Sequence, residues 1–591
     1  MSEVNKVILE IVEKEETKLS GKGIQENIDI TGNFSVINPS KTNRIWNAVR
    51  VIKGIETTNI ADVEEKIGEI KPEGKNIISY KIQEQDVSYK PLIELTEIID
   101  TYFEKGDETN WNFVLNKRSP TKFVLKLKNN SKEPTSKVNL KKIIPEVYDS
   151  PVIESTSSGN ANYDESSRTV HWTDVSIAPG GEQILSFRAG ANPLTTEPSS
   201  AGAIDVDYQI ENVQRSKLVP SLQSVAESIF ALEKSESMDK QGEWECTVEF
   251  ENTSDFEVTL NQVMVQHKKE TTLETILEEN PSVVLPPKHN WSKDFLVKSS
   301  SPPKFTKTNK FKVDTQIVKR VIGHISKTAD IIPVSAIDAR KIVTPQEINA
   351  HAKTDINVEI LIKNSGSSPL SAINIIDTIP NGFKPPSLDQ IDVFIRSSKV
   401  SQGVLLELEP NNDDPKMQHQ LTIEIPDITK NTSVLAPNDD FIVRYPLIAW
   451  DPSPNNYPCP LEANFNVKPP GPPVKSTIPD LKFIAKQVRR RYRAFKQVRP
   501  GGEEGEFVIN VVFQNKGEVP VQKCKIAEKI PQNFVLVNWS PEEIKPESTD
   551  IDEGTKITWN LTNVGAGAEV TLTYTIKGTG DYEEEDPEVE F

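Results

Sequence analysis

The stretch NSGSSPLSAINIIDTIPNGF, from Asn364 to Phe383, decides the fold class of this chain. It reads as the end of one strand, a polar turn, a second strand and a proline stop. Apolar and polar residues alternate in its strand segments, which is typical of strands with one buried face. It contains no catalytic nucleophile, metal-ligand group or phosphate-binding loop. The stretch therefore predicts an architecture and no chemistry.

The same signature, strand–turn–strand, occurs five times along the chain. An asparagine begins each turn, because its side chain bonds its own backbone and tolerates left-handed φ angles. We therefore interpret these asparagines as structural and not catalytic. They are Asn38, Asn130, Asn252, Asn364 and Asn515.

A second signature follows later in each copy: an apolar residue, a Pro/Gly turn and an alternating strand that carries an aromatic residue. Such a pattern predicts a hairpin-like edge. Trp172 and Trp559 also match each other, on the strand just before this turn. We expect the matching aromatic residues to lie in the core. They are Tyr80, Phe187, Phe295, Tyr445 and Tyr574.

The spacing of the second signature sets the size of the repeating unit. Its prolines, at positions 72, 179, 286 and 437, are 107, 107 and 151 residues apart. Short strands with frequent turn signals predict an all-β chain, a tandem array of five immunoglobulin-like β-sandwich domains. The predicted modules are 1–97, 98–216, 217–331, 332–478 with an insertion, and 479–580, followed by an acidic tail, 581–591.

Two segments between the strong strand patterns carry weaker signals. LETILEEN, from Leu273, predicts at most a short helix or a loop. VKPPGPPVKSTIPD, residues 467–480, is rich in proline and predicts a semi-rigid polyproline II spacer before the last module.

The pattern Asn-x-Gly, Pro-Leu-Ser and Ile-x-Ile-x-Asp-x-Ile-Pro-x-Gly-Phe resembles the archaeal and bacterial conserved-repeat family known as the domain-of-unknown-function 11 type. The resemblance covers 358–384 and, less fully, 508–537. The first three copies depart from it, since they lack the Asp-x-Ile-Pro-x-Gly-Phe segment. The resemblance implies immunoglobulin-like spacers of cell-surface and envelope proteins, without catalytic residues to transfer.

Composition bounds the function classes. The chain has 591 residues and a formal net charge of −19, and a uniformly acidic surface repels nucleic acid and anionic lipid. No stretch is apolar enough for a membrane helix, and the amino terminus lacks a secretory pattern. We therefore expect a cytoplasmic protein; the alternative is the cell surface, reached by an unrecognised route. The three cysteines are far apart, which favours buried free thiols over disulfides.

No motif in the chain points to catalysis or to a cofactor. The six histidines show no metal-ligand spacing, and no Gly-rich loop opens a helix. The acidic loops at Glu409 and Asp550 offer oxygen ligands for calcium, but neither has the spacing of a dedicated calcium loop. We therefore predict no catalytic residues, no cofactor and no metal site.

One charge feature stands out: seven basic residues lie between positions 486 and 500 of a strongly acidic chain. An exposed strand face explains them, and among functional interpretations we favour an acidic protein partner, either another protein or the chain's own tail. Contact with a membrane surface is less favoured, and nucleic acid is not expected. The predicted partner-binding residues are Lys486, Arg489, Arg490, Arg491, Tyr492, Arg493, Lys496 and Arg499, with Asp581, Glu583, Glu584, Glu585, Asp586, Glu588 and Glu590 in the tail.

The last module has little chain left for a final strand. It either closes with the segment EVEF at residues 588–591 or leaves an open edge that recruits a strand from a partner or from another copy.

The sequence as a whole predicts a non-enzymatic scaffold, spacer or adaptor that binds protein partners or itself. A structural or adhesive protein of the cell envelope is the alternative. An enzyme whose site is assembled between domains is a remote one, because loops on sandwiches can carry chemistry without local motifs.

Overall fold

The computed structural model describes residues 5–83, 89–103, 109–269, 272–430, 433–487, 489 and 491–591. Its regular elements there are strands and three short 3-10 turns, η1 (Ile55–Thr57), η2 (Leu388–Gln390) and η3 (Ile428–Lys430). No helix in this part is long and apolar enough to cross a membrane. The predicted all-β class of tandem sandwiches is confirmed.

The chain divides into two compact units, which we describe separately. Unit 1 comprises Met1–Ala336, Ser365–Pro369 and Asn466–Val474. Unit 2 comprises Ile337–Asn364, Leu370–Phe465 and Lys475–Phe591.

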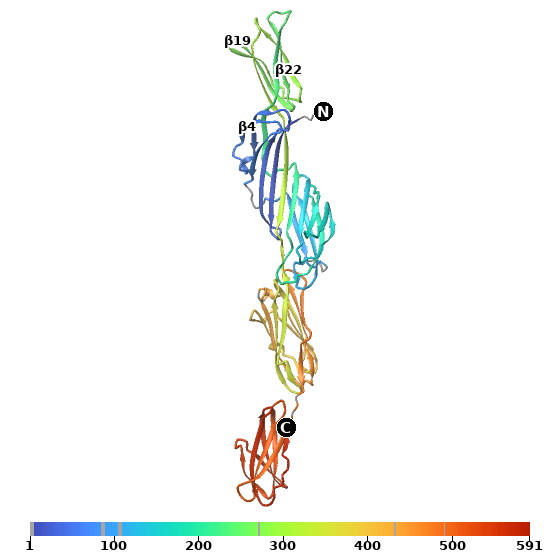
Figure 1. Ribbon diagram of the computed structural model, residues 1–591, viewed down its shortest axis with the longest axis vertical. Coiled ribbons are helices and arrows are strands. Elements are labelled where there is room, and N and C mark those ends of the chain that lie inside the picture. Colours follow the sequence, from blue (N-terminus) through green and yellow to red (C-terminus); the bar gives the residue numbers. More distant parts are fainter. Residues whose placement is uncertain are drawn as a thin grey trace. The chain divides into compact units, whose positions relative to one another are not determined.

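An eight-stranded sheet runs through the first two sandwiches of unit 1. Two long strands lie side by side and parallel at its centre, although about 300 residues separate them in sequence (Figure 1). In spatial order the strands are β11 (Asn160–Asp164), β12 (Thr169–Thr173), β9 (Thr135–Ile143), β15 (Ile204–Glu211), β24 (Thr315–Lys327), β1 (Val7–Leu19), β2 (Gln25–Ile37) and β5 (Lys75–Lys81).

Two smaller sheets cover the two halves of this shared sheet. The β1 half shares a hydrophobic core with the strands β16 (Val219–Val225), β3 (Ile45–Lys53) and β4 (Glu64–Ile70). The β9 half shares a second core with β10 (Val152–Thr156), β13 (Glu182–Ala191), β8 (Ser119–Asn129) and β6 (Ile93–Asp100). Two short pairs complete this region: β14 (Ser199–Ser200) with β25 (Ile331–Ile332), and β7 (Phe113–Val114) with β26 (Val334–Ser335).

The third sandwich of unit 1 consists of two further sheets. One contains β17 (Ser228–Glu236), β18 (Glu243–Asn252) and β22 (Asn290–Lys298). The other contains β20 (Thr272–Glu279), β19 (Val258–Lys269), β21 (Val283–Leu285) and β23 (Phe305–Val313). The segment LETILEEN, predicted as a short helix or loop, is therefore part of strand β20, which pairs with β19.

Unit 2 contains the fourth and fifth sandwiches. The fourth is built from β27 (Ile337–Thr344), β29 (Thr354–Asn364), β36 (Asp440–Ala449), β31 (Phe383–Lys384), β32 (Asp392–Ile395) and β33 (Ser398–Val400), which face β34 (Leu405–Glu409), β35 (His419–Ile425), β30 (Leu370–Ile379), β38 (Leu461–Val467) and β39 (Val474–Ile478). A small sheet joins it, formed by β28 (Glu347–Asn349), β40 (Lys482–Lys486) and β37 (Asn455–Pro458). Part of the predicted polyproline spacer is thus the edge strand β39.

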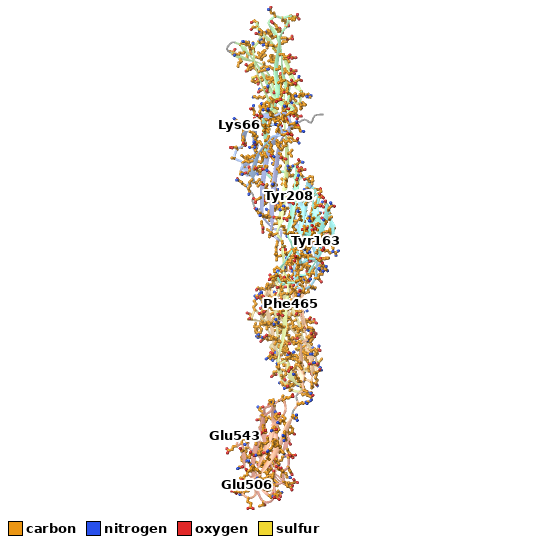
Figure 2. The ribbon with its side chains drawn as sticks, in the orientation of Figure 1. Lys66, Tyr163, Tyr208, Phe465, Glu506 and Glu543 are labelled. Carbon is orange, nitrogen blue, oxygen red and sulfur yellow. The ribbon has the colours of Figure 1, made fainter. Side chains whose placement is uncertain are left out.

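The fifth sandwich pairs two four-stranded sheets. Figure 2 marks Glu506, which begins a central strand of the first sheet. That sheet is β41 (Tyr492–Pro500), β42 (Glu506–Asn515), β47 (Glu569–Gly578) and β44 (Phe534–Ser540). The second is β45 (Glu547–Ile551), β46 (Gly554–Val564), β43 (Val521–Pro531) and β48 (Glu588–Glu590).

The interiors of the first three predicted modules are not separate. Strand β16, in the predicted third module, pairs with β3 of the first, and β24 joins β1 to β15. A core that continues from the first sandwich into the third contains both Phe34 and Phe250. The module boundaries given above stay predictions.

The predicted core aromatics lie inside, with Trp172 and Trp559 fully buried and Phe295 partly buried. The three cysteines are free and buried, as predicted.

The turn asparagines connect the two sheets of each sandwich. In the first sandwich, Asn38 Nδ2 donates to the carbonyls of Asn43 (3.0 Å) and Ile70 (3.2 Å), so it bonds both its own turn and the end of a strand in the opposite sheet. In the fifth, Asn515 Nδ2 donates in the same way to Val519 (2.8 Å) and Val564 (3.0 Å). The acceptors Ile70, Ile177, Leu285, Leu435 and Val564 are the first residues of the second sequence signature.

In the second sandwich the neighbouring asparagine takes this position. Asn129 is fully buried and its Nδ2 donates to Glu133 (2.8 Å) and Ile177 (3.1 Å), whereas the predicted residue, Asn130, is exposed. The Oδ1 of Asn129 accepts the backbone N–H of Ser131 at 2.9 Å, which is the local turn bond that asparagine was expected to make. The prediction of Asn130 was therefore wrong by one residue, because two successive asparagines have the same turn propensity.

Asn129→Ala is expected to destabilise the second sandwich by about 2–3 kcal/mol, because it removes the two bonds that Nδ2 donates and takes the Oδ1 acceptor away from the backbone N–H of Ser131. Hydrogen exchange of the β8 and β13 amides measures this as a lower free energy of local opening. Asn130→Ala is the matched control and should change it by only a few tenths of a kcal/mol. Equal effects of the two substitutions would contradict the role of Asn129.

Candidate functional site

The predicted basic residues do not form one continuous patch. Lys486 ends β40 in the fourth sandwich and pairs with Glu347 at 2.5 Å. Arg489 and Arg491 lie between β40 and β41, and Arg490 lies outside the described residues. The other members, Tyr492, Arg493, Lys496 and Arg499, belong to β41.

Lys496 points into the fifth sandwich and is not available to a partner. Its Nζ lies 2.8 Å from Glu528 Oε2 and 3.3 Å from the hydroxyl of Tyr582, and its side chain is buried. Burial acts against the ammonium, but the bond to Glu528, the charge of that carboxylate and Tyr582 together outweigh burial and raise the pKa of Lys496. Lys496 is therefore a core cation, and the sequence prediction of a partner-binding residue does not fit its burial.

The remaining basic residues of β41 are exposed beside an open sheet edge. Strand β41 is the last strand of its sheet and, among the described residues, pairs only with β42. Arg493 lies over the ring of Phe495 at 4.8 Å, and Tyr492 is 46% exposed. Within the part of the chain that the structure describes, Arg489, Arg491, Arg493 and Arg499 make no ion pair. These four arginines are called the arginine edge below.

The acidic tail closes the fifth sandwich in cis. Strand β48 pairs with β43 in antiparallel register, with Val589 opposite Ile526. The ring of Tyr582 packs against Phe507 and Phe534, both at 5.9 Å, and Phe591 packs against Tyr492 at 4.9 Å. Of the two alternatives for this end of the chain, closure by the EVEF segment is the one observed.

The tail does not neutralise the arginine edge. Glu588 pairs with Lys556 at 2.7 Å, on the opposite sheet from β41. For the other tail acids, the described residues provide no ion pair. These are Asp581, Glu583, Glu584, Glu585, Asp586 and Glu590. The tail therefore binds its sandwich through a strand and aromatic rings, and both charged segments keep exposed, uncompensated charge.

Truncation after Gly580 is expected to open the edge of β43 and to remove Tyr582 from the core. The truncated chain should lose thermal stability and self-associate, as measured by calorimetry and light scattering. A synthetic peptide of residues 581–591 should restore the stability and the molecular mass in solution of the unaltered chain. Replacing Glu583, Glu584 and Glu585 by Gln keeps β48 and should change neither quantity. A truncated chain that behaves like the unaltered one would show that β48 contributes nothing.

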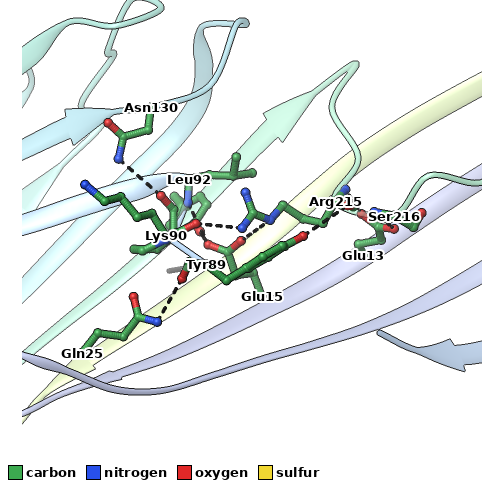
Figure 3. Close-up of polar contacts among 11 residues, drawn as sticks. Glu13, Glu15, Gln25, Tyr89, Lys90, Leu92, Asn130, Arg215 and Ser216 are labelled. Carbon is green, nitrogen blue, oxygen red and sulfur yellow. Dashed lines mark hydrogen bonds and ion pairs between the residues drawn. The ribbon is translucent and has the colours of Figure 1, made fainter. Parts of the chain in front are cut away.

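A buried polar cluster, which the sequence did not reveal, lies where the first two sandwiches meet (Figure 3). The inward row of β1 is apolar at Val7, Leu9 and Ile11 and then continues with Glu13 and Glu15, both fully buried. The apolar residues belong to the core of the first sandwich, while Leu19 at the end of the strand belongs to that of the second. The two glutamates therefore occupy the passage between two cores.

Each glutamate of this cluster is held by a tyrosine and by the segment around Arg215. Glu13 Oε1 accepts from the hydroxyl of Tyr80 (2.7 Å) and the backbone N–H of Ser216 (3.0 Å). Glu15 pairs with Arg215 Nε at 2.9 Å and also accepts from the hydroxyl of Tyr208, which Figure 2 marks. Burial raises the pKa of Glu15 above its usual value, although Arg215 opposes this.

The two tyrosine rings explain two glycines in the shared sheet. A Cβ atom on Gly323 would lie 1.9 Å from the ring of Tyr208, and one on Gly32 would lie 2.3 Å from that of Tyr80. Only glycine leaves room for a ring at these sites. The ring of Tyr80 passes over Gly32 to reach Glu13, and the ring of Tyr208 passes over Gly323 to reach Glu15. The cluster is therefore a structural contact that links the cores of the first two sandwiches.

Arg215→Met is expected to destabilise unit 1 by about 3 kcal/mol at neutral pH, because it leaves Glu15 buried without its cation. The pKa of Glu15 is higher in the folded chain than in the unfolded chain. As the pH rises above the usual pKa of a glutamate, Glu15 therefore ionises first in the unfolded chain, and the free energy of unfolding falls with further increase in pH. The loss in Tm should therefore be larger at pH 8 than at pH 5 by calorimetry. Arg118→Met, an exposed arginine paired with Asp149, is the control; a pH-independent loss at Arg215 would contradict the assignment.

Buried lysine–carboxylate pairs occur at corresponding places in the second, fourth and fifth sandwiches. Glu97 on β6 binds Lys142 at 2.7 Å and Lys327 at 2.6 Å. Lys341 on β27 binds Asp377, and Lys496 on β41 binds Glu528. In each case the first strand of the sandwich supplies one partner of the pair. The other partner lies 13 residues after the buried turn asparagine: Lys142 after Asn129, Asp377 after Asn364, and Glu528 after Asn515.

The hollows of the surface are lined by both polar and apolar residues. One of about 490 Å³ lies on β17, β18 and β22 and includes Glu233, Glu245 and Asp294. Another, of about 700 Å³, lies in the fourth sandwich beside the ion pair of Lys384 with Asp413 (2.6 Å). A search of the described residues finds no group of three or more His, Cys, Asp or Glu side chains placed to hold a metal ion.

No protein-family model and no curated protein matches this chain. Solved structures align over much of it with low identity and low TM-scores. The mu homology domain of Danio rerio Fcho1, with a bound Eps15 peptide, is 10% identical and covers 55% of this chain and 98% of its own, with a TM-score of 0.26. The C-terminal domain of the Streptococcus agalactiae antigen I/II polypeptide BspA is 10% identical and covers 65% and 98%, at 0.25. BcpA, the major pilin subunit of Bacillus cereus, is 9% identical and covers 84% and 95%, at 0.23. TM-scores this low support no statement about function.

Proposed function

We propose that this chain is a non-enzymatic modular scaffold that binds protein partners along the exposed edges of its sandwiches. The observation that carries the proposal is the arginine edge, four exposed arginines without acidic partners beside an open strand of the fifth sandwich. An open strand offers a row of backbone donors and acceptors to an added strand. The partner that suits this edge is an extended acidic segment of another protein.

Charge and hydrogen bonding have different roles in such a contact. Backbone hydrogen bonds along β41 contribute affinity for an added strand whatever the sequence of that strand. The exposed arginines select an acidic partner and speed its association. The ring of Phe495 beneath Arg493 holds that guanidinium in place, 4.8 Å above the ring. The net charge of −19 opposes nucleic acid and anionic membranes, which therefore remain the less favoured partners.

The ionisable residues in the interior fit a scaffold better than an enzyme. Glu13, Glu15, Glu97, Asp377 and Glu528 are buried against tyrosine, lysine or arginine partners inside packed sandwiches. Their carboxylates serve the packing of sheets; Glu97 also borders a hollow of about 310 Å³, where Lys327 is its partner. Removing one partner of such a pair leaves an uncompensated buried charge, so each group is needed for the fold of its sandwich.

We also propose a cytoplasmic location for the scaffold. Three buried free cysteines are compatible with a reducing compartment. Cell fractionation that recovers the protein with the envelope would contradict this location and favour an adhesive or structural role there.

Replacing Arg489, Arg491, Arg493 and Arg499 by Glu is expected to abolish the capture of partners on the full chain. Capture by the unaltered chain should also weaken between low and high salt, because exposed ion pairs are screened. The control is a chain with Glu at Lys310 and Lys312, exposed lysines of another open strand, β23. Proteins recovered from native lysate are identified by mass spectrometry.

The results separate the competing interpretations. Retention of the same partners by the arginine variant would contradict the arginine edge as a binding site. Capture dominated by nucleic acid, or retention on anionic vesicles, would contradict a protein partner.

A further inference from the structure

The fourth sandwich holds a lysine and an aspartate in direct contact inside a closed apolar interior. Lys341, on the first strand β27, and Asp377, on β30, have side chains 2% and 0% exposed. Lys341 Nζ contacts Asp377 Oδ1 and also donates to the carbonyl of Cys459 at 3.1 Å. The hydroxyl of Tyr445, on β36, donates to the other carboxylate oxygen, Asp377 Oδ2.

The surroundings of this pair exclude water. Buried apolar side chains occupy inward positions of the two strands that carry the pair, β27 and β30, and of β29, β35 and β36 in the same two sheets. These residues are Val343, Val358, Ile360, Ile375, Ile379, Leu421, Ile423, Val443 and Leu447.

We propose that Lys341 and Asp377 condense to an amide, a covalent cross-link between the two sheets of the fourth sandwich. Two groups held in contact react as one molecule, so the entropy of bringing them together has already been spent in folding. The condensation releases one water molecule. Because the apolar interior excludes water, hydrolysis of the amide is disfavoured once the amide has formed. The inference concerns a modification of this chain and does not depend on the proposed scaffold function.

The reaction balances without a co-reactant. A proton passes from the Lys341 ammonium to the Asp377 carboxylate, which gives a neutral amine and a neutral acid. Desolvation raises the pKa of Asp377, although Lys341 opposes this, and it thereby favours the neutral acid. The amine nitrogen attacks Cγ and forms the N–C bond, the C–OH bond breaks, and the hydroxyl leaves as water with the second amine proton. No atom is oxidised or reduced.

Tyr445 is positioned to assist the step. Its hydroxyl already bonds Oδ2, the oxygen that carries negative charge in the tetrahedral intermediate and becomes the carbonyl oxygen of the amide. A hydrogen-bond donor aimed at that oxygen stabilises the charge as it develops. The carbonyl of Cys459 accepts from the lysine nitrogen and orients it toward Cγ.

The cross-link would join parts of the chain that no continuous sheet joins. Strand β27 belongs to the sheet of β29 and β36, whereas β30 belongs to the sheet of β35 and β38. Among the residues that the structure describes, β27 is an edge strand that pairs only with β29. An amide from its centre to the opposite sheet would keep it attached when the edge opens.

The test is the mass of the full-length chain after denaturation. We expect it to be lower than the sequence mass by one water molecule, with a branched peptide that contains both Lys341 and Asp377 after proteolysis. Lys341→Arg keeps the positive charge but has a guanidinium that does not condense, so its mass should equal that of its sequence. Tyr445→Phe should retain the fold and show a larger fraction of uncross-linked chain.

Three outcomes would overturn the proposal. They are an unaltered mass of the natural chain, a loss of water that persists in Lys341→Arg, and a branched peptide mapped to another pair such as Lys496 with Glu528. The measurement on the natural chain decides the matter even where a variant does not fold, and Asp377→Ala provides a second chain in which the amide cannot form.

Discussion

A buried asparagine amide that joins two sheets is the interaction on which each sandwich depends. Its Nδ2 group donates to carbonyls of its own turn and of the opposite sheet, and its Oδ1 accepts a backbone N–H two residues later. Aspartate has no donors and leucine has neither group, so only a neutral side chain with both functions fits this buried site. Because the bond fixes where one strand ends against the other sheet, it sets the register of the inward positions that follow.

Those inward positions explain why buried charges recur and why their signs differ. The second sandwich places Glu97 on its first strand and Lys142 at the matching inward site, whereas the fourth places Lys341 and Asp377 in the reverse order. An ion pair requires one positive and one negative side chain that face each other. Either sheet can supply the lysine, provided that the opposite sheet supplies the carboxylate. In the third sandwich the corresponding residue is Val265, which is buried and apolar, so the site accepts either a pair or a hydrocarbon group.

The shared sheet of unit 1 shows how far pairing departs from chain order. Strand β24 follows β23 of the third sandwich almost directly, yet it runs parallel to β1 over thirteen residues and joins two sandwiches into one sheet. Alternation of apolar and polar residues is the same for a strand at an edge and for one at the centre. Glu13 and Glu15 illustrate this, because their charge suggests exposure to solvent, whereas in the structure they are fully buried and fill the passage between two cores.

The sequence by itself determined the strand class, four of the five turn asparagines, the core aromatics and the general form of the repeat, because each follows from the chemistry of a few neighbouring residues. Only the tertiary structure decided that Asn129 and not Asn130 is buried, that Lys496 faces inward, and that the acidic tail ends in a paired strand. It also decided that LETILEEN is a strand, since β19 supplies its partner. These features depend on groups distant in sequence, and a local pattern carries no information about which distant strand or charge will lie opposite.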